Sequence, residues 1–380
     1  MGKNNLANQY MNGQKHVFFK EEKSDLKHIG FLSLKIALKS YFSTYLAVKD
    51  NLITHPNSYS FILNDLENLE YNNKYYEASS ETIIHFQHFF ELVIKDILGK
   101  ESPLLAVKAN TNSIIFHKLI NKEEITSDEA DKLYSIEFSE AIKCFFELLE
   151  NDRLKCMSKY NFFKDEKING VKARDILETL NLFRNRTWHK GMFILKYNAL
   201  DEFVGKYILP LVKKILGISD YSKYAEKYMF YKEASCSYMN IMNLNVFDKI
   251  VEENKLSNSN SGKIAFLKEV GRTFYYLKDR GENNYKYDSI INEQGENGLI
   301  IDIKKCPVCG LNTLIHRYDY MEEEEYDVPY GVDPKRISKY ESDVKCINCT
   351  FQLNKYVENL KSYGYSFEDF WDSYDIFDEE

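Results

Sequence analysis

Apolar side chains recur every three to four residues over most of the first 280 positions, which is the spacing of amphipathic helices. The pattern predicts helices over about 29–48, 58–69, 79–98, 113–120, 128–150, 171–190, 198–216, 221–254 and 262–279. The helix over 79–98 is apolar over more than half of its circumference, so we expect it to lie deep in a bundle. Beyond position 281 the chain changes to turn-rich stretches and short apolar runs, which are typical of small β-hairpins. A mainly α protein with a small C-terminal β region is therefore predicted.

Two pairs of cysteines lie within this β region. Each pair has the spacing C-x-x-C, which lets one tight turn direct two sulfurs at a tetrahedral ion. Gly310 follows the first pair and tolerates the positive φ of such a turn, whereas Thr350 follows the second pair and is less suited to it. Because no secretion signal accompanies the cysteines, a closed structural zinc site is favoured over a disulfide framework, unmetallated thiols or a redox motif. His316 is a spare ligand or, more simply, a surface residue. The expected zinc ligands are Cys306, Cys309, Cys346 and Cys349.

These patterns divide the chain into four segments. We predict an N-terminal helical extension over 1–77, a helical bundle over 78–217, connecting helices over 218–281, and a zinc ribbon with an acidic C-terminal region over 282–380. No window approaches the roughly 18 consecutive apolar residues of a membrane span. The first 20 residues hold no apolar signal-peptide core. A cytoplasmic protein without a membrane partner is expected.

The charge is distributed unevenly along the chain. The net charge is −8, yet residues 318–380 hold 17 acidic and 6 basic side chains, which leaves +3 for the rest. This balance excludes a uniformly basic nucleic-acid coat but not a local basic site. The acidic end is either a solvated tail or a segment that mimics nucleic acid and covers a basic site.

A local basic cluster lies in the segment TLNLFRNRTWHKG, residues 179–191, at the end of the helix predicted over 171–190. Histidine titrates near neutrality and can move a proton, the planar fork of arginine suits phosphate, and asparagine can position either group. Arg184, Asn185 and His189 together suit metal-independent RNA cleavage, in which a ribose 2′-OH attacks its own phosphodiester. On a straight helix Asn185 and His189 lie about 40° apart, but Arg184 and His189 lie about 140° apart. We therefore expect either a bent helix end or a second copy that completes the site across a two-fold axis.

The sequence Arg-Asn-x-x-x-His near a helix end, together with the earlier helix His85-Phe-Gln-His-Phe-Phe-Glu-Leu-Val-Ile-Lys95, resembles the HEPN domain over about 78–217. The resemblance implies an α-helical bundle that dimerises with two motifs in one composite cleft. It also implies metal-independent endoribonuclease activity, which is common in toxins and antiviral defence. Arg184 would stabilise the phosphate charge, His189 would be the acid–base or leaving-group residue, and Asn185 would position them. Toxins of the family that are silenced by nucleotidylation carry Tyr two residues after the His, where this chain has Gly191.

Several of these residues have simpler interpretations. Arg184 and His189 could be ordinary cations at a helix C-terminus, where the helix dipole favours them. Trp188 fits core packing or a dimer interface better than a base-stacking platform. Two histidines of the earlier helix, at 85 and 88, have the spacing of metal ligands but fit better as hydrogen-bonded bundle residues. Glu91 and Lys95 fit an internal or interfacial ion pair.

Two functions of different classes remain open from the sequence. The first is a homodimeric ribonuclease, a toxin or antiviral effector, with RNA as substrate and a regulatory protein or nucleic acid as trigger. The second is a non-catalytic module, in which the helices and the zinc ribbon assemble a nucleic-acid or protein complex. The intact Arg-Asn-x-x-x-His favours the first, while the acidic C-terminal end favours a protein-contacting ribbon in either case.

Overall fold

The computed structural model describes residues 26–49, 72–108, 112–126, 129, 132–190, 193–228, 246–255, 261–280, 300–322 and 337–354. The predicted helix over 58–69 and the acidic residues 323–325 and 378–380 lie outside these ranges. The helices are α2 (Leu26–Val48), α3 (Asn73–Glu101), α4 (Ser113–Ile120), α6 (Phe138–Glu150), α7 (Met157–Asp165), α8 (Ala173–Lys190), α9 (Tyr197–Phe203), α10 (Leu209–Leu216), α11 (Ser219–Tyr228), α12 (Val246–Lys255) and α13 (Ser261–Arg280). A 3-10 turn, η3 (Pro103–Leu105), follows α3, and a π-helical turn, η4 (Val204–Ile208), joins α9 to α10.

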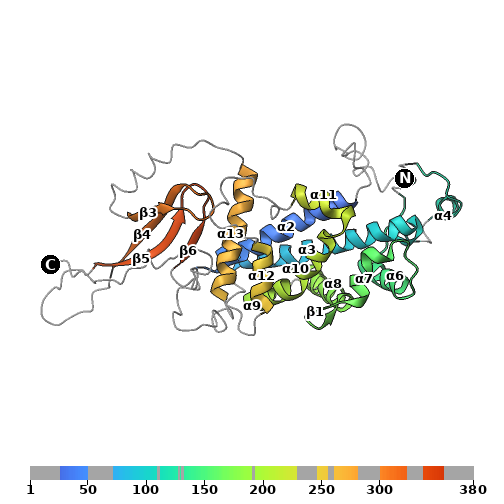
Figure 1. The fold of residues 1–380 in the computed structure, drawn as a ribbon, viewed down its shortest axis with the longest axis horizontal. Helices are drawn as coiled ribbons and strands as arrows, with labels where there is room; N and C mark the ends of the chain where they lie inside the picture. The colour runs from blue at the N-terminus through green and yellow to red at the C-terminus, as the bar shows by residue number, and fades with distance from the viewer. Residues whose placement is uncertain are drawn as a thin grey trace, which may run out of the picture.

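The strands form two small antiparallel sheets. β1 (Lys167–Ile168) pairs with β2 (Val171–Lys172) as a short hairpin before α8. The second sheet has the order β3 (Ile300–Lys305), β4 (Asn312–Glu322), β5 (Ile337–Cys346) and β6 (Gln352–Asn354). The prediction of a mainly α chain with a small C-terminal β region is confirmed. In Figure 1 the helices form one elongated body along α2 and α3, and α13 stands between that body and the second sheet.

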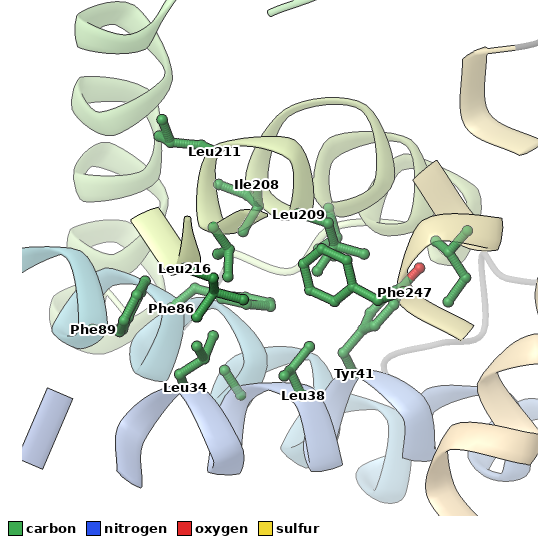
Figure 2. Close-up of a cluster of buried hydrophobic side chains, with 14 of the residues drawn as sticks. Leu34, Leu38, Tyr41, Phe86, Phe89, Ile208, Leu209, Leu211, Leu216 and Phe247 are labelled. Carbon is green, nitrogen blue, oxygen red and sulfur yellow. The ribbon is translucent and has the colours of Figure 1, made fainter. Parts of the chain in front are cut away.

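The hydrophobic core runs between α2, α3 and the helices that follow α8. α2 packs along α3, and α13 packs against α2 so closely that a Cβ on Gly271 would lie 2.7 Å from the Phe42 ring. Figure 2 shows buried side chains from α2, α3, η4, α10 and α12 that lie together in this core. The labelled residues are Leu34, Leu38, Tyr41, Phe86, Phe89, Ile208, Leu209, Leu211, Leu216 and Phe247. The prediction that the helix over 79–98 lies deep in a bundle is confirmed by its buried Phe86, Phe89 and Phe90.

Three helix starts differ from the sequence prediction, two because of local capping and one because of the hairpin that precedes it. α3 begins at Asn73, because Asn72 Oδ1 accepts a hydrogen bond from the amide of Tyr75 at 3.0 Å. The helix expected over 128–150 begins at Phe138, where Glu137 and Glu140 form a capping box. The helix expected from position 171 begins two residues later, because Val171 and Lys172 belong to the hairpin.

The π-helical turn has a local cause in Pro210. Proline has no amide hydrogen, so the carbonyl of Lys206, four residues earlier, loses its ordinary helical partner. The side chain of Asn169, at the turn of the β1–β2 hairpin, donates a 2.6 Å hydrogen bond to that carbonyl. Asn169 and Gly170 both have positive φ, which a two-residue hairpin of this kind requires. The β1–β2 hairpin is therefore fastened to the π-helical turn η4.

A buried ion pair holds α13 to α9. Lys268 Nζ lies 2.7 Å from Asp201 Oδ1, and both side chains are almost fully buried. The ammonium also lies 3.9 Å from the centre of the Tyr197 ring and 4.9 Å from that of Tyr41. Burial lowers the pKa of Lys268 to about 8, although the negative charge of Asp201 acts in the opposite direction. Burial also raises the pKa of Asp201.

Asp201→Ala is expected to lower the free energy of unfolding by about 3–5 kcal/mol, because it leaves the Lys268 charge buried without a partner. The matched control is Glu202→Ala, the adjacent residue, whose exposed pair with Lys206 contributes about 0.5 kcal/mol or less. Chemical denaturation measures both. The double variant Asp201→Leu with Lys268→Met should recover most of the stability that Asp201→Ala loses. If Asp201→Ala lost no more stability than Glu202→Ala, the role of the buried pair would be contradicted.

Candidate functional site

The four predicted zinc ligands lie together at the turns of the second sheet. Their sulfurs are all within 4.8 Å of one another, and all four residues are buried. The sulfurs of Cys306 and Cys349 lie 3.5 Å apart, and those of Cys309 and Cys346 lie 3.7 Å apart. A tetrahedral ion with metal–sulfur bonds of about 2.3 Å places its ligands about 3.8 Å apart. The cluster can therefore hold one metal ion, and four thiolates close its coordination sphere, which suits a structural role.

Both C-x-x-C turns have the same backbone conformation. The amide of Gly310 bonds the carbonyl of Cys306 at 2.9 Å, and the amide of Thr350 bonds that of Cys346 at 2.9 Å. Gly310 has a φ of 73° and Thr350 a φ of 61°. This conformation costs a β-branched residue about 1–2 kcal/mol. The second turn is thus strained, as the missing glycine predicts, and something outside the turn must hold it.

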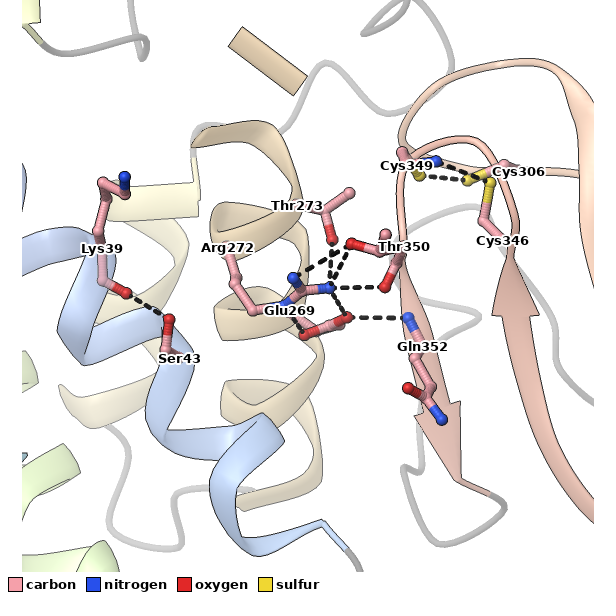
Figure 3. Close-up of polar contacts among 10 residues, drawn as sticks. All are labelled: Lys39, Ser43, Glu269, Arg272, Thr273, Cys306, Cys346, Cys349, Thr350 and Gln352. Carbon is pink, nitrogen blue, oxygen red and sulfur yellow. Dashed lines mark hydrogen bonds and ion pairs between the residues drawn. The ribbon is translucent and has the colours of Figure 1, made fainter. Parts of the chain in front are cut away.

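α13 supplies that support, which Figure 3 shows. Arg272 Nη2 donates to the carbonyl of Thr350 at 2.6 Å, and both terminal nitrogens of Arg272 lie 3.3 Å from its hydroxyl. Glu269 is fully buried, binds Arg272 through two hydrogen bonds and accepts a 2.8 Å bond from the amide of Gln352. The Glu269–Arg272 pair therefore fastens the second metal turn to the helical body. Sequence reasoning missed both residues, because an ordinary Glu-x-x-Arg spacing on a helix carries no metal signal.

The remaining features of the cluster suit a metal site. Burial raises the pKa of Cys306 and of Cys349, which a divalent cation would counter by binding the thiolate form. The hydroxyl of Thr313 lies 3.1 Å from the Cys346 sulfur, where it can donate a hydrogen bond to a thiolate. His316 is not the surface residue that the sequence suggests, because it is 1% exposed on β4, and it is not part of the four-cysteine cluster.

The second candidate site is the C-terminal end of α8, where the sequence places Arg184, Asn185 and His189. Arg184 Nη1 lies 3.0 Å from Asn185 Oδ1 and 3.3 Å from His189 Nε2. The three side chains thus meet on one helix of one chain. Arg184 and Asn185 are half-buried, while His189 is exposed.

The expectation that Arg184 and His189 need a bent helix or a second copy is wrong for the side chains. α8 continues as a helix to Lys190. An angular separation of about 140° describes the Cα–Cβ directions, but the long arginine chain spans that angle. His189 also leans toward the preceding turn, as helical side chains do, and so meets the guanidinium.

This contact fixes the chemistry that each group can offer. Arginine has no acceptor, so Nη1 must donate, and His189 Nε2 must be unprotonated in this arrangement, with its lone pair accepting the bond. Among the residues that the structure describes, Arg184 Nε and Nη2 make no hydrogen bond. A base and two donor nitrogens of a planar fork, which make no hydrogen bond to the described residues, therefore lie side by side at an open surface.

The chain after α8 holds the helix end in place. The Phe193 ring stacks on Phe183 at 5.2 Å, and Thr187 Oγ1 donates to the carbonyl of Phe193 at 3.3 Å. The Arg186 guanidinium lies 5.8 Å from the Phe193 ring. Gly191, the expected helix cap, lies outside the described residues. The site is thus presented on a packed helix end.

α3 lies beside this site. Glu91 and Lys95 pair at 2.5 Å, and Lys95 also donates to Ser135 at 2.9 Å, so they form the internal ion pair that the sequence suggests. His88 Nδ1 is hydrogen-bonded to the Ser33 hydroxyl at 2.8 Å. Burial lowers the pKa of His88, Glu91 opposes this, and the charges of Lys95 and Arg184 add to the lowering. Arg184 is therefore within electrostatic reach of α3.

Trp188 is 64% exposed, one helical turn beyond Arg184. Of its two expected places, the core is wrong, whereas a dimer interface, like the alternative of a base-stacking platform, stays a prediction. A depression of about 370 Å³ between α2 and α3 is lined by other residues, among them Lys39, Lys74 and Glu81. Because Trp188 and His189 are exposed, the α8 site lies at the surface.

None of the described helices is long and apolar enough to cross a bilayer. The chain was compared with protein-family models, with curated proteins and with solved structures, and none of them matches it. The HEPN resemblance therefore rests on the residues of this chain alone.

Proposed function

We propose that the chain is a metal-independent endoribonuclease that acts through Arg184, Asn185 and His189. The observation that carries the proposal is the contact of Arg184 Nη1 with Asn185 Oδ1 and His189 Nε2, which leaves Nε and Nη2 without a hydrogen bond to the described residues. The resemblance to HEPN toxins and antiviral effectors supports the same reading. The four-cysteine cluster would hold zinc as a structural ion.

The reaction follows from these groups. RNA binding would displace Arg184 Nη1 from His189 Nε2, which then accepts the proton of a ribose 2′-OH, and the resulting oxygen attacks the adjacent phosphorus. Arg184 Nε and Nη2 donate to the non-bridging oxygens, where negative charge develops, and Asn185 holds the guanidinium in position. The P–O5′ bond breaks, the leaving oxygen takes the proton that His189 accepted, which restores the neutral imidazole, and the products are a 2′,3′-cyclic phosphate and a 5′-hydroxyl.

A homodimer remains part of the proposal, but the reason for it changes. Because one chain already brings Arg184 to His189, a second copy is not needed to assemble this pair. It would instead place two complete motifs in one cleft. Light scattering of the purified protein, run beside the cleavage assay, establishes which oligomer is active.

The product ends test the chemistry directly. End-labelled single-stranded RNA is incubated with zinc-loaded protein in magnesium-free buffer containing EDTA, and zinc retention is measured in the same sample. We expect fragments that end in 2′,3′-cyclic phosphate. Fragments with 3′-hydroxyl ends that form only when magnesium is added would indicate metal-dependent hydrolysis and overturn the proposal. An absence of cleavage, with zinc retained, would favour the non-catalytic assembly module.

A further inference from the structure

Trp188 is the most exposed large aromatic side chain beside the proposed site. It lies four residues after Arg184, so the two are neighbours on one face of α8, and it directly precedes His189. Within the described part of the chain, its indole makes no hydrogen bond and no ring contact. Trp188 is 64% exposed, and it lies next to the Arg184 guanidinium, two nitrogens of which make no hydrogen bond to the described residues. The helix end therefore presents a flat apolar face beside a group that can donate to a phosphate.

We propose that Trp188 is the platform on which an unpaired nucleobase stacks next to the phosphate held by Arg184, which makes single-stranded RNA the substrate class. This inference rests on the proposed function and adds a specificity-determining residue to it. Aromatic side chains stack on any base, so the platform tolerates different sequences. It requires a base whose face is free, which a base within a duplex does not offer.

Charge favours a nucleotide over a second copy of this surface as the occupant. The end of α8 carries Arg184, one helical turn before Trp188, together with an exposed Arg186 and the exposed His189. Packing two such ends directly against each other across a two-fold axis, with no nucleic acid between them, would bring like charges close. An oligonucleotide instead brings a phosphate to the unused donors of Arg184 and a flat ring to the indole. The same surface therefore complements both parts of one nucleotide.

Fluorescence can observe this platform directly. The chain has two tryptophans, so Trp371→Phe leaves Trp188 as the sole tryptophan, whose emission is excited selectively at wavelengths where tyrosine does not absorb. The probe is a short 2′-O-methyl oligoribonucleotide, which cannot be cleaved because its 2′ oxygen is blocked, and its partner probe is an abasic oligomer of equal length and charge. We expect the base-bearing probe to quench Trp188 and to bind about tenfold or more tightly than the abasic one.

Variants separate stacking from charge. Trp188→Ala, followed with a labelled probe, should weaken the base-bearing probe about tenfold and leave the abasic probe unchanged, while Trp188→Phe should retain most of the affinity. Leu182→Ala is the matched control, because Leu182 is exposed on the same helix at 47% and should not change either affinity.

The outcomes distinguish this inference from the proposed function. Equal affinity and equal quenching by both probes would overturn the platform and leave the ribonuclease proposal standing. Quenching of Trp188 that rises with protein concentration in the absence of a probe, together with loss of the dimer in Trp188→Ala by light scattering, would assign the indole to a contact with a second copy. This result would also overturn the platform. Failure of both probes to bind would overturn the platform together with RNA as the ligand.

Discussion

Cys309→Ser is expected to unfold the β3–β6 sheet while α2, α3 and α8 remain folded. A structural zinc ion contributes about 10–16 kcal/mol in small zinc domains at neutral pH. Hydrogen exchange, read separately over 300–322, 337–354 and the helices, measures the effect. We expect protection to fall strongly in the two ranges of the sheet. The control is Cys144→Ser, because Cys144 is half-buried on α6 and belongs to no metal cluster in the described residues.

The same experiment reports on α13. The Glu269–Arg272 pair holds the turn that carries Cys346 and Cys349. The part of α13 around this pair should therefore lose protection when that turn opens. Arg272→Ala should reproduce the loss at α13 and in the second turn but leave the zinc content near one ion per chain. Unchanged exchange of the sheet in Cys309→Ser, or a wild-type protein without bound zinc, would contradict a structural zinc site.

His189→Ala is expected to reduce the rate of RNA cleavage about 10²- to 10⁴-fold, which is the usual contribution of a positioned acid–base group. Its physical basis is the unprotonated Nε2 of His189, which accepts a hydrogen bond from Arg184 in the unbound protein. Initial rates on a labelled single-stranded RNA measure the loss. Arg184→Lys should also lose most of the activity, because an ammonium keeps the charge but lacks the planar fork.

Arg186→Ala is the matched control for charge at this helix end. Arg186 is exposed, lies between the two functional residues in sequence and contacts Phe193 and not the His189 ring. We expect its cleavage rate to stay within a few-fold of wild type. Equal losses for Arg186→Ala and His189→Ala would mean that the cations act only as a basic surface near the helix dipole, and the assignment of His189 as the base would fall.

The features that the sequence predicted well are local ones. The C-x-x-C pairs place two sulfurs at each turn by their spacing alone, and the apolar period of α3 identifies a buried helix. The Arg-Asn-x-x-x-His segment identified the residues that meet, yet its geometry was misjudged, because wheel angles ignore the length of the Arg184 side chain. The Asn169-Gly170 turn was a readable hairpin signal that the helical pattern around it obscured.

The features that sequence could not predict join distant parts of the chain. The Lys268–Asp201 pair spans 67 positions, and the Arg272–Thr350 contact spans 78. No periodicity relates such residues, since each lies on an ordinary helix or turn. The start of α3 shows the same limit on a smaller scale. Asn72 caps the helix while its amide also donates to the carbonyl of Ala47 at the end of α2, a contact that only the folded pair of helices makes.

The central claim is that His189 and Arg184 direct a ribose 2′-OH against its own phosphodiester. A DNA strand that carries a single ribonucleotide tests it most directly, because only one position then holds a 2′-OH. Zinc-loaded protein in magnesium-free buffer should cut this strand once, on the 3′ side of the ribonucleotide, and leave a 2′,3′-cyclic phosphate, while His189→Ala leaves it intact. Cleavage at deoxynucleotides, or equal cleavage by His189→Ala, would contradict the account.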